Sequence, residues 1–167
     1  GMFGRSYPGL SALLAAGQAP PHLKAIFPDK AAFETYDTVY PGGIHQSSFV
    51  ATESIGVKLM DNSISFQMGP GTFGPVRPVD ADSDGGMLRA ALREHIWNRD
   101  IFDMISDLPF RNSIDSAGST AFHPERSPGT YAKQISSSGV AIYLLDGWFN
   151  FSPTDALVWF RNLPNSK

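Results

Sequence analysis

Short apolar runs alternate along the chain with longer stretches in which apolar residues recur every three or four positions. Residues 23–27 and 140–145 form two such runs, and each is followed by a proline or by Asp146-Gly147. They are too short for helices, and continuous apolar runs of this length are typical of strands buried in a parallel sheet. A third strand is expected to end at residue 5, immediately before a glycine-flanked turn.

The stretches with helical spacing favour amphipathic helices. The best defined follows Asp84-Gly85-Gly86, where apolar residues and His95 share one face up to residue 96. Another begins with Ser152 as N-cap, a proline at the first helical position and an acid three residues past the cap. Helices are therefore expected over residues 10–17, 49–60, 88–96, 101–108, 131–135 and 156–163.

The predicted order is strand, helix, strand, long helical segment, strand and helix, which is typical of the α/β class. The sheet-containing core is expected at residues 1–28 and 139–167, with a helical insertion between them at residues 29–138. The expected architecture is thus a small parallel sheet interrupted by a large helical insert.

Composition narrows the functional classes. The chain has 167 residues, 42% of them hydrophobic and 17% charged, so it is long enough for one folded domain and too apolar for a disordered chain. The net charge is −3 and the basic residues are scattered, which argues against a nucleic-acid partner. No apolar run approaches the length of a membrane-spanning helix, so no membrane partner is expected. The lack of Cys excludes disulfides, a thiolate nucleophile and cysteine-based metal sites. The compartment stays undecided, with the cytoplasm as the working expectation.

Residues 4–9 read Gly-Arg-Ser-Tyr-Pro-Gly. This spacing is typical of a nucleophile elbow, in which a serine occupies a strained turn between a strand and a helix. Glycines are needed there because the chain packs back on itself, and the helix N-terminus supplies N–H groups and partial positive charge for an oxyanion. The usual motif has glycine two residues after the serine, whereas here Pro8 occupies that position and Gly9 follows. On this motif alone, a glycine-flanked turn without chemistry stays open as the alternative.

Further segments extend the comparison along the chain. Together with residues 4–9 they resemble, in order, the sequence blocks of the X-Pro dipeptidyl-peptidase and cocaine-esterase-like group of α/β-hydrolases. The blocks are Gly1-Met2-Phe3, residues 21–28, Tyr40-Pro41-Gly42-Gly43, Asp80-Ala81-Asp82 with Asp84-Gly85, residues 95–100, Pro109-Phe110-Arg111 and Gly147-Trp148-Phe149. The resemblance implies a partial α/β-hydrolase fold with few parallel strands and a large helical cap insertion. It also implies a serine hydrolase of peptidase or esterase type that acts on small esters, amides or peptides and uses no cofactor.

The resemblance implies roles for a few residues. Ser6 matches the nucleophile, and the backbone N–H of Tyr7 matches an oxyanion-hole donor. The family's catalytic acid ends a Gly-Trp-Tyr-Asp block, and this chain has Asn150 at that position. An asparagine can orient a histidine but supplies no negative charge, so triad chemistry should be severely depressed. Asp146 and Asp155 are alternative acids, although Asp155 already has a helix-capping role and Asp146 precedes the required turn.

The general base is a larger gap, because family members place the histidine beyond the acid. All four histidines of this chain precede residue 150, and a hydrogen-bonded or surface imidazole is the simplest interpretation of each. His45 and His123 are expected in loops of the insert. His95 is the candidate for the substrate pocket, since the cap covers the active site in this family, and Trp148 and Phe149 are expected there too.

Other clusters carry less chemistry. Asp80, Asp82 and Asp84 alternate as in a calcium loop, but Ala91 stands where the bidentate glutamate would lie. A loop that caps the next helix is the favoured interpretation, and no metal site is expected. The aromatic residues Trp159 and Phe160 are expected in the core.

With a nucleophile motif but no base, the sequence predicts a truncated family member with weak or no activity of its own. The low charged fraction and the unpaired edges of a partial sheet predict association into a homo-oligomer. Two alternatives stay open. One is an active hydrolase completed by a partner chain, and the other is a non-catalytic module that associates with itself through its sheet edges.

Overall fold

The computed structural model describes residues 1–62, 79–116, 118, 120–150 and 153–163. The chain separates into two compact units. The first, here called the sheet unit, comprises Gly1–His45 and Leu108–Lys167, and the second, the helical unit, comprises Gln46–Asp107. Each unit is described by itself.

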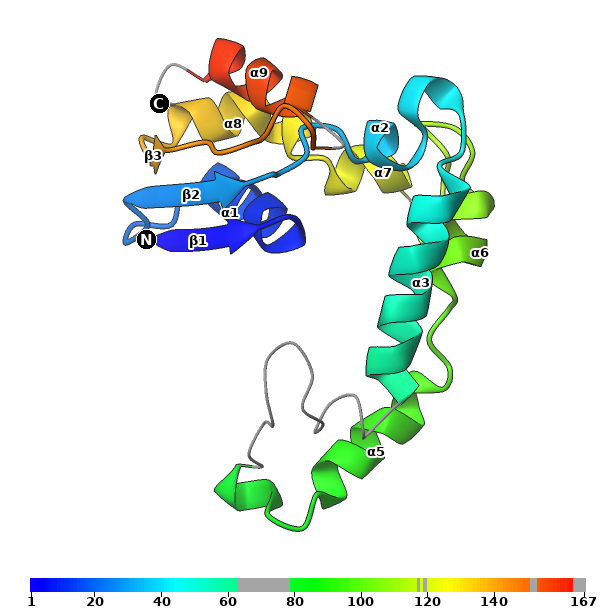
Figure 1. Ribbon diagram of the computed structural model, residues 1–167. Helices are drawn as coiled ribbons and strands as arrows, with labels where there is room; N and C mark the ends of the chain where they lie inside the picture. The colour runs from blue at the N-terminus through cyan, green and yellow to red at the C-terminus, as the bar shows by residue number, and fades with distance from the viewer. Residues whose placement is uncertain (63–78, 117, 119, 151–152, 164–167) are drawn as a thin grey trace. The chain divides into compact units, whose positions relative to one another are not determined.

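The sheet unit contains three parallel strands in the order β1-β2-β3, as Figure 1 shows. These are β1 (Met2–Arg5), β2 (Ala25–Asp29) and β3 (Ala141–Ile142). Helix α1 (Tyr7–Gly17) connects β1 to β2, as the sequence predicts. A parallel pair joined through a helix confirms the expected α/β class.

Two strands differ in extent from their predicted bounds. Strand β2 begins two residues later than expected and continues through Pro28, whose carbonyl accepts a hydrogen bond from the Leu145 N–H at 3.2 Å. A proline is tolerated there because it still offers a carbonyl, although it cannot donate. Strand β3 is shorter than residues 140–145, but its ladder continues as an isolated parallel bridge between Asp29 and Leu145.

One face of the sheet packs against helices. Ile26 and Ile142 of neighbouring strands lie in a buried cluster with residues of α1, α8 (Ala132–Ser137) and α9 (Pro153–Asn162). Trp159 is fully buried in this cluster, as expected. The expectation for Phe160 is wrong, because the next position along a helix is turned by about 100° and its ring is 61% exposed. The predicted N-cap Ser152 lies outside the described residues.

The opposite face of the sheet carries a row of aromatic rings, Phe3, Phe27 and Tyr143, one from each strand or its end. Their centroids are separated by 5.4 Å and 5.2 Å. Phe3 is 68% and Tyr143 58% exposed. Side chains alternate between faces along a strand, so burial of Ile26 and Ile142 turns their neighbours Phe27 and Tyr143 to this second face.

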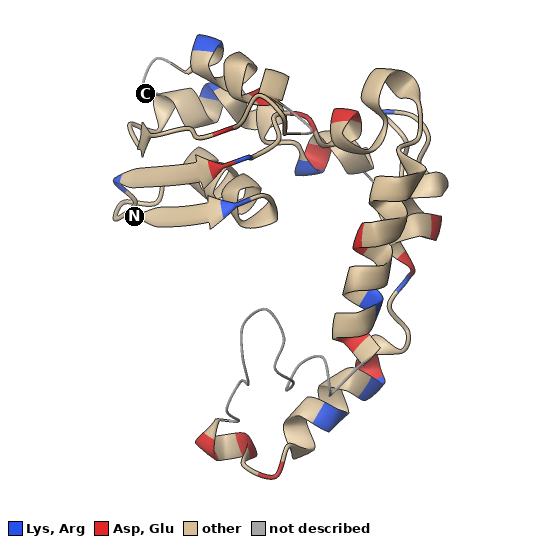
Figure 2. Cartoon of the chain, viewed as in Figure 1, with Lys and Arg blue, Asp and Glu red and all other residues tan. Residues whose placement is uncertain are grey.

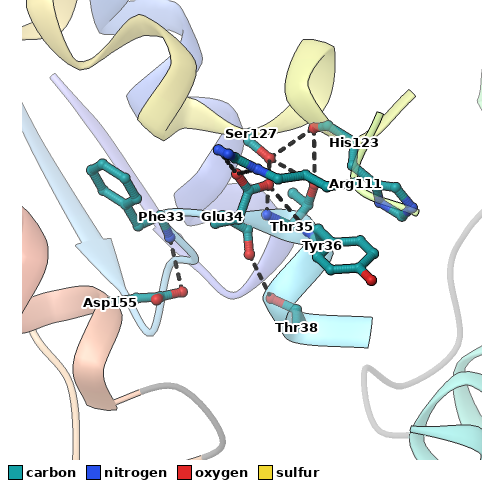
Figure 3. Close-up of polar contacts among 9 residues, drawn as sticks. All are labelled: Phe33, Glu34, Thr35, Tyr36, Thr38, Arg111, His123, Ser127 and Asp155. Atoms are coloured by element: carbon teal, nitrogen blue, oxygen red, sulfur yellow. Dashed lines mark hydrogen bonds and ion pairs between the residues drawn. The ribbon is translucent and has the colours of Figure 1, made fainter. Parts of the chain in front are cut away.

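Beyond β2 the chain is anchored by a buried carboxylate. Glu34 accepts hydrogen bonds from Arg111 Nε at 2.7 Å and from the Ser127 hydroxyl, and the Thr35 N–H donates to Ser127 Oγ at 2.9 Å (Figure 3). Glu34 is 6% exposed and Ser127 fully buried. These bonds fix the start of α2 (Thr35–Val39) against the end of α7 (Phe122–Arg126). Short 3-10 turns follow each helix, at Pro41–Gly43 and Pro128–Tyr131.

The expectation for His123 is wrong, because it lies in α7 and not in a loop. Its side chain is buried, and its Nε2 lies 3.1 Å from the Leu108 carbonyl oxygen. Burial lowers the pKa of this imidazole, which keeps it neutral near pH 7. His123 is therefore a hydrogen-bonded core residue of the sheet unit.

The helical unit consists of α3 (Ser47–Asn62), a 3-10 turn (Asp80–Asp82), α5 (Gly86–His95) and α6 (Ile101–Ser106). Asp100, the N-cap of α6, pairs with Lys58 of α3 at 2.5 Å and accepts a hydrogen bond from Ser54 at 2.9 Å. The Lys58 ammonium holds the pKa of Asp100 well below its usual range. These contacts connect α3 to α6.

The acidic loop before α5 caps that helix. Asp82 Oδ1 and Oδ2 accept from the N–H groups of Met87 and Leu88 at 2.7 Å and 2.9 Å, and Asp84 accepts from Gly86 at 3.0 Å. Both oxygens of Asp82 are thus engaged by orphan donors of the first helical turn. The capping interpretation of this loop is confirmed.

Lys and Arg residues, blue in Figure 2, are scattered along the described elements of both units. Among the described residues, no helix combines the length and apolar character needed to cross a membrane.

Candidate active site

Ser6 lies between β1 and α1 and is exposed to solvent. Its backbone has φ 59° and ψ −124°, which L-residues other than glycine rarely adopt. The Ser6 N–H donates to the Asp29 carbonyl at 2.8 Å, and the Ser6 carbonyl accepts from Leu10 at 3.0 Å. The turn is therefore held by β2 on one side and by the first turn of α1 on the other.

Two glycines allow this turn to close. A Cβ on Gly4 would lie 2.5 Å from the Pro8 carbonyl oxygen and 2.6 Å from the Gly9 nitrogen. A Cβ on Gly9 would lie 2.7 Å from the Gly4 carbonyl oxygen and 3.3 Å from that of Asp29. The obstacles are backbone atoms, which cannot move aside without opening the turn. Glycine is thus required two residues before and three residues after Ser6, whereas Pro8 fits at the second.

The N-terminus of α1 faces the same turn. Tyr7 is the first helical residue, so its N–H has no acceptor within the helix, and Pro8 has no N–H to offer. Partial positive charge gathers at this end of the helix. A negatively charged oxygen beside Ser6 Oγ would find the Tyr7 N–H as the nearest donor of the helix.

The ends of the three strands are tied together at one edge of the sheet. Besides the bond from Ser6 to the Asp29 carbonyl, the Lys30 N–H donates to the Leu145 carbonyl at 2.8 Å. Asp29 is 2% exposed, and its carboxylate lies 2.6 Å from Arg5 Nε. The residues after β3 therefore reach the same edge as Ser6, with β2 between them.

A side-chain pair follows β3 at this edge. Asn150 Nδ2 donates to Asp146 Oδ1 at 2.7 Å, and the Gly147 N–H donates to the same oxygen at 2.7 Å. The Asn150 N–H also closes a turn on the Gly147 carbonyl at 2.9 Å. Asn150 is thus bonded directly to a carboxylate four positions earlier. The sequence analysis did not predict that Asp146 and Asn150 form a pair. The signal that could have indicated it is their spacing of four residues around Gly147.

The other expected site residues are placed as follows. Trp148 and Phe149 lie in the turn between Asp146 and Asn150, and both are exposed, Trp148 to 78%. His95 lies at the end of α5 in the helical unit, with its Nδ1 3.4 Å from Asp61 Oδ1. His95 and Asp61 line a cavity of about 110 Å³ within the helical unit. Their roles toward substrate stay predictions.

Asp155 lies in the first turn of α9, where the sequence predicts an acid after the N-cap. Its Oδ2 accepts from the Phe33 N–H at 2.9 Å and so ties the first turn of α9 to the segment before α2 (Figure 3). Burial raises the pKa of this carboxyl to about 6, and the nearby carboxylates Asp37, Asp146 and Glu34 add to the rise. Asp155 is thus a structural acceptor facing several like charges. Within the described residues there is also no group of three or more His, Asp or Glu side chains that could hold a metal ion.

A strained serine between a parallel strand and a helix, with glycines packed against the turn, defines the serine hydrolases of the α/β class. The chain matches the X-Pro dipeptidyl-peptidase (S15) family over residues 1–167, and it belongs to that family. This confirms the family that the sequence blocks predict, together with a partial α/β fold.

Two curated relatives are mycobacterial proteins that carry the name "Putative serine esterase". One is from Mycobacterium bovis (strain ATCC BAA-935 / AF2122/97) and the other from Mycobacterium tuberculosis (strain CDC 1551 / Oshkosh). Each is 28% identical over 169 aligned positions, which include 88% of this chain. The chain spans about 27% of the length of these relatives.

Proposed function

We propose that this chain carries the nucleophile of a serine hydrolase, with Ser6 attacking the carbonyl carbon of a small ester, amide or peptide. The observation that supports this most is the backbone of Ser6, which is held at φ 59° by bonds from both sides. Strain of this kind is stored where a side chain must be presented in one direction. In the proposed site, this conformation presents the hydroxyl beside the N-terminus of α1.

In the proposed reaction, the Ser6 oxygen bonds to the substrate carbonyl carbon and the hydroxyl proton passes to a general base. The carbonyl oxygen becomes negatively charged and is stabilised by the Tyr7 N–H and the positive end of α1. When the tetrahedral intermediate collapses, the base returns the proton to the leaving alcohol or amine. A water molecule then hydrolyses the acyl-serine by the same steps.

The base is the missing component. His123 is buried with its Nε2 against a backbone carbonyl, and His95 lies in the helical unit beside Asp61. Neither is hydrogen-bonded to Ser6. We therefore propose that these 167 residues alone have weak or no hydrolase activity, and that a histidine from other polypeptide completes the site.

An active-site probe tests this proposal. A fluorophosphonate should label Ser6 slowly, p-nitrophenyl acetate turnover should be weak, and Ser6→Ala should abolish both. Ser11→Ala, on the same helix, is the matched control and should leave labelling unchanged. Equal labelling of the Ser6→Ala variant would show that the turn is not a nucleophile site, and fast turnover by the isolated chain would refute the missing base.

A second candidate function comes from the aromatic row of the sheet. Phe3 and Tyr143 are largely exposed, and parallel sheets normally have both faces covered. This observation favours a module that associates with itself without catalysis. A chain that remains monomeric at all concentrations would exclude that function.

A further inference from the structure

We infer that Asp146 and Asn150 together replace the single catalytic acid of the family, with Asn150 accepting the imidazole N–H and Asp146 supplying the negative charge behind it. The inference rests on the proposed function, because it concerns the orientation of the histidine that serves Ser6. Both residues are positioning residues, since neither touches the substrate carbonyl in this arrangement.

The hydrogen bond between the two side chains determines which way the Asn150 amide faces. A carboxylate has no proton to donate, so only the NH₂ end of the amide can be directed at Asp146. The distance of 2.7 Å from Nδ2 to Asp146 Oδ1 is that of a charge-assisted bond. The amide oxygen is therefore turned away from Asp146 as an acceptor, which is what an imidazole N–H requires.

Asp146 itself is fixed by the backbone. The Gly147 N–H donates to its Oδ1 at 2.7 Å, while its Oδ2 is buried without a hydrogen-bond partner among the described residues. A carboxylate in such surroundings polarises the amide to which it is bonded. Through the amide, its charge favours the protonated imidazole that forms when Ser6 gives up its proton.

Other carboxylates near this edge are already engaged. Asp29 is paired with Arg5 at 2.6 Å, which cancels much of its field toward a neighbour. Asp155 is bonded to the Phe33 N–H and is itself repelled by the charge of Asp146. Of the carboxylates at the strand ends, Asp146 is the one joined to the family's acid position.

The decisive variant is Asp146→Asn. It keeps the shape of the side chain and an oxygen that accepts from Asn150, so a merely structural role predicts unchanged labelling of Ser6. With imidazole added as the base, loss of charge should instead lower the labelling rate by about 100-fold, less than the loss of about 10⁴ for an acid bonded directly to the histidine. Asp80→Asn, an exposed aspartate of the helical unit, removes the same charge as a control.

Moving the charge should reverse the effect. In the double variant Asp146→Asn with Asn150→Asp, the carboxylate occupies the family's acid position and bonds the imidazole directly. Its labelling rate should equal or exceed that of the unchanged protein. All rates are measured with and without added imidazole, which supplies a base to the 167-residue chain. With imidazole present, an unchanged rate in Asp146→Asn, or no recovery in the double variant, would overturn the inference.

A measurement independent of labelling separates this inference from the proposed function. In ¹H–¹⁵N spectra, the Asn150 side-chain amide should shift on Asp146→Asn, and added imidazole should perturb it in the unchanged protein but much less in the variant. If Ser6→Ala is labelled as well as the unchanged protein, the proposed nucleophile fails. If the Asn150 amide is insensitive to Asp146→Asn or to imidazole, the composite acid is refuted, whatever the labelling shows.

Discussion

Ser6 places a side chain on a backbone conformation that glycine adopts freely. Its φ of 59° with ψ of −124° carries a cost of about 1–3 kcal/mol for a residue with a Cβ. Glycine avoids this strain, but it costs about 0.5–1 kcal/mol more than alanine in chain entropy on folding. Because the strain relieved exceeds the entropy lost, glycine should be the more stable residue at this position.

Ser6→Gly should therefore raise the free energy of unfolding by about 1 kcal/mol while removing the proposed nucleophile. Ser6→Ala, which retains the strained Cβ, should leave stability nearly unchanged. Urea denaturation of the three proteins measures this difference. A glycine variant no more stable than the alanine variant would show that the turn is relaxed.

Gly9 makes the complementary prediction. Its substitution by alanine places a methyl group 2.7 Å from the Gly4 carbonyl oxygen, and overpacking of this kind costs about 1–3 kcal/mol. Gly9→Ala should lower stability by that amount and also abolish Ser6 labelling, because the turn must open. Gly56→Ala, in α3 of the helical unit, is the control, since a Cβ there meets nothing within 4 Å. Thermal melting with probe labelling checks both effects.

At the scale of elements, α5 depends on the loop before it. Asp82 accepts from two N–H groups of the first turn, whereas Asp84 accepts from one. Asp82→Ala should cost about 1–2 kcal/mol and Asp84→Ala less. Hydrogen exchange at Met87 and Leu88 should accelerate only in the Asp82 variant. Equal exchange in the two variants would contradict the assignment of Asp82 as the cap.

The first turn of α9 carries a pH dependence. The pKa of Asp155 is about 6 in the folded chain, above its ordinary value of 3.8, so the folded state binds this proton more tightly than the unfolded state. The protonated Asp155 carboxyl therefore contributes to the free energy of unfolding fully below about pH 4. This contribution is lost as the pH rises through 6, where the folded chain releases the proton. Asp155→Asn keeps an acceptor for the Phe33 N–H and should be more stable than the unchanged protein by about 1 kcal/mol at pH 7.5.

The comparison must be made as a difference between the two proteins across pH, because His123 also titrates with folding. Its lowered pKa gives stability above about pH 6.5 that is lost on acidification, opposite in sign to Asp155. Chemical denaturation at pH 4 and pH 7.5 should show the Asp155→Asn advantage only at the higher value. An equal advantage at both values would mean that burial does not disfavour the Asp155 charge.

Across the whole molecule, local signals predicted elements and the turn at Ser6, but not contacts between distant segments. The cap of α5 and the glycine spacing of the turn at Ser6 involve residues within six positions of one another, so spacing alone revealed them. Ser127 is hydrogen-bonded to Glu34, 93 residues earlier, and to Thr35, 92 residues earlier. The spacing of apolar residues along the chain carries no signal for such distant contacts. Asp146 and Asn150 are close in sequence, yet their bond depends on how the glycine turn folds back.

The exposed aromatic row gives a prediction at the same scale. Tyr143→Lys should reduce the binding of anilinonaphthalene sulfonate and any self-association seen by sedimentation, because it puts a charge at one end of the apolar aromatic row. Ile55→Lys, at an exposed apolar position of the helical unit, is the control and should change neither. Equal effects of the two variants would mean that the sheet face has no special role.

The strained backbone at Ser6 also bears on the history of the sequence. Selection for folding alone would drift toward glycine at this position, since a single substitution relieves the torsion. Under the proposed function, serine is retained there because its hydroxyl supplies chemistry that glycine cannot. Substitution to glycine in descendants of this chain would accordingly mark lineages in which the chemistry has lapsed.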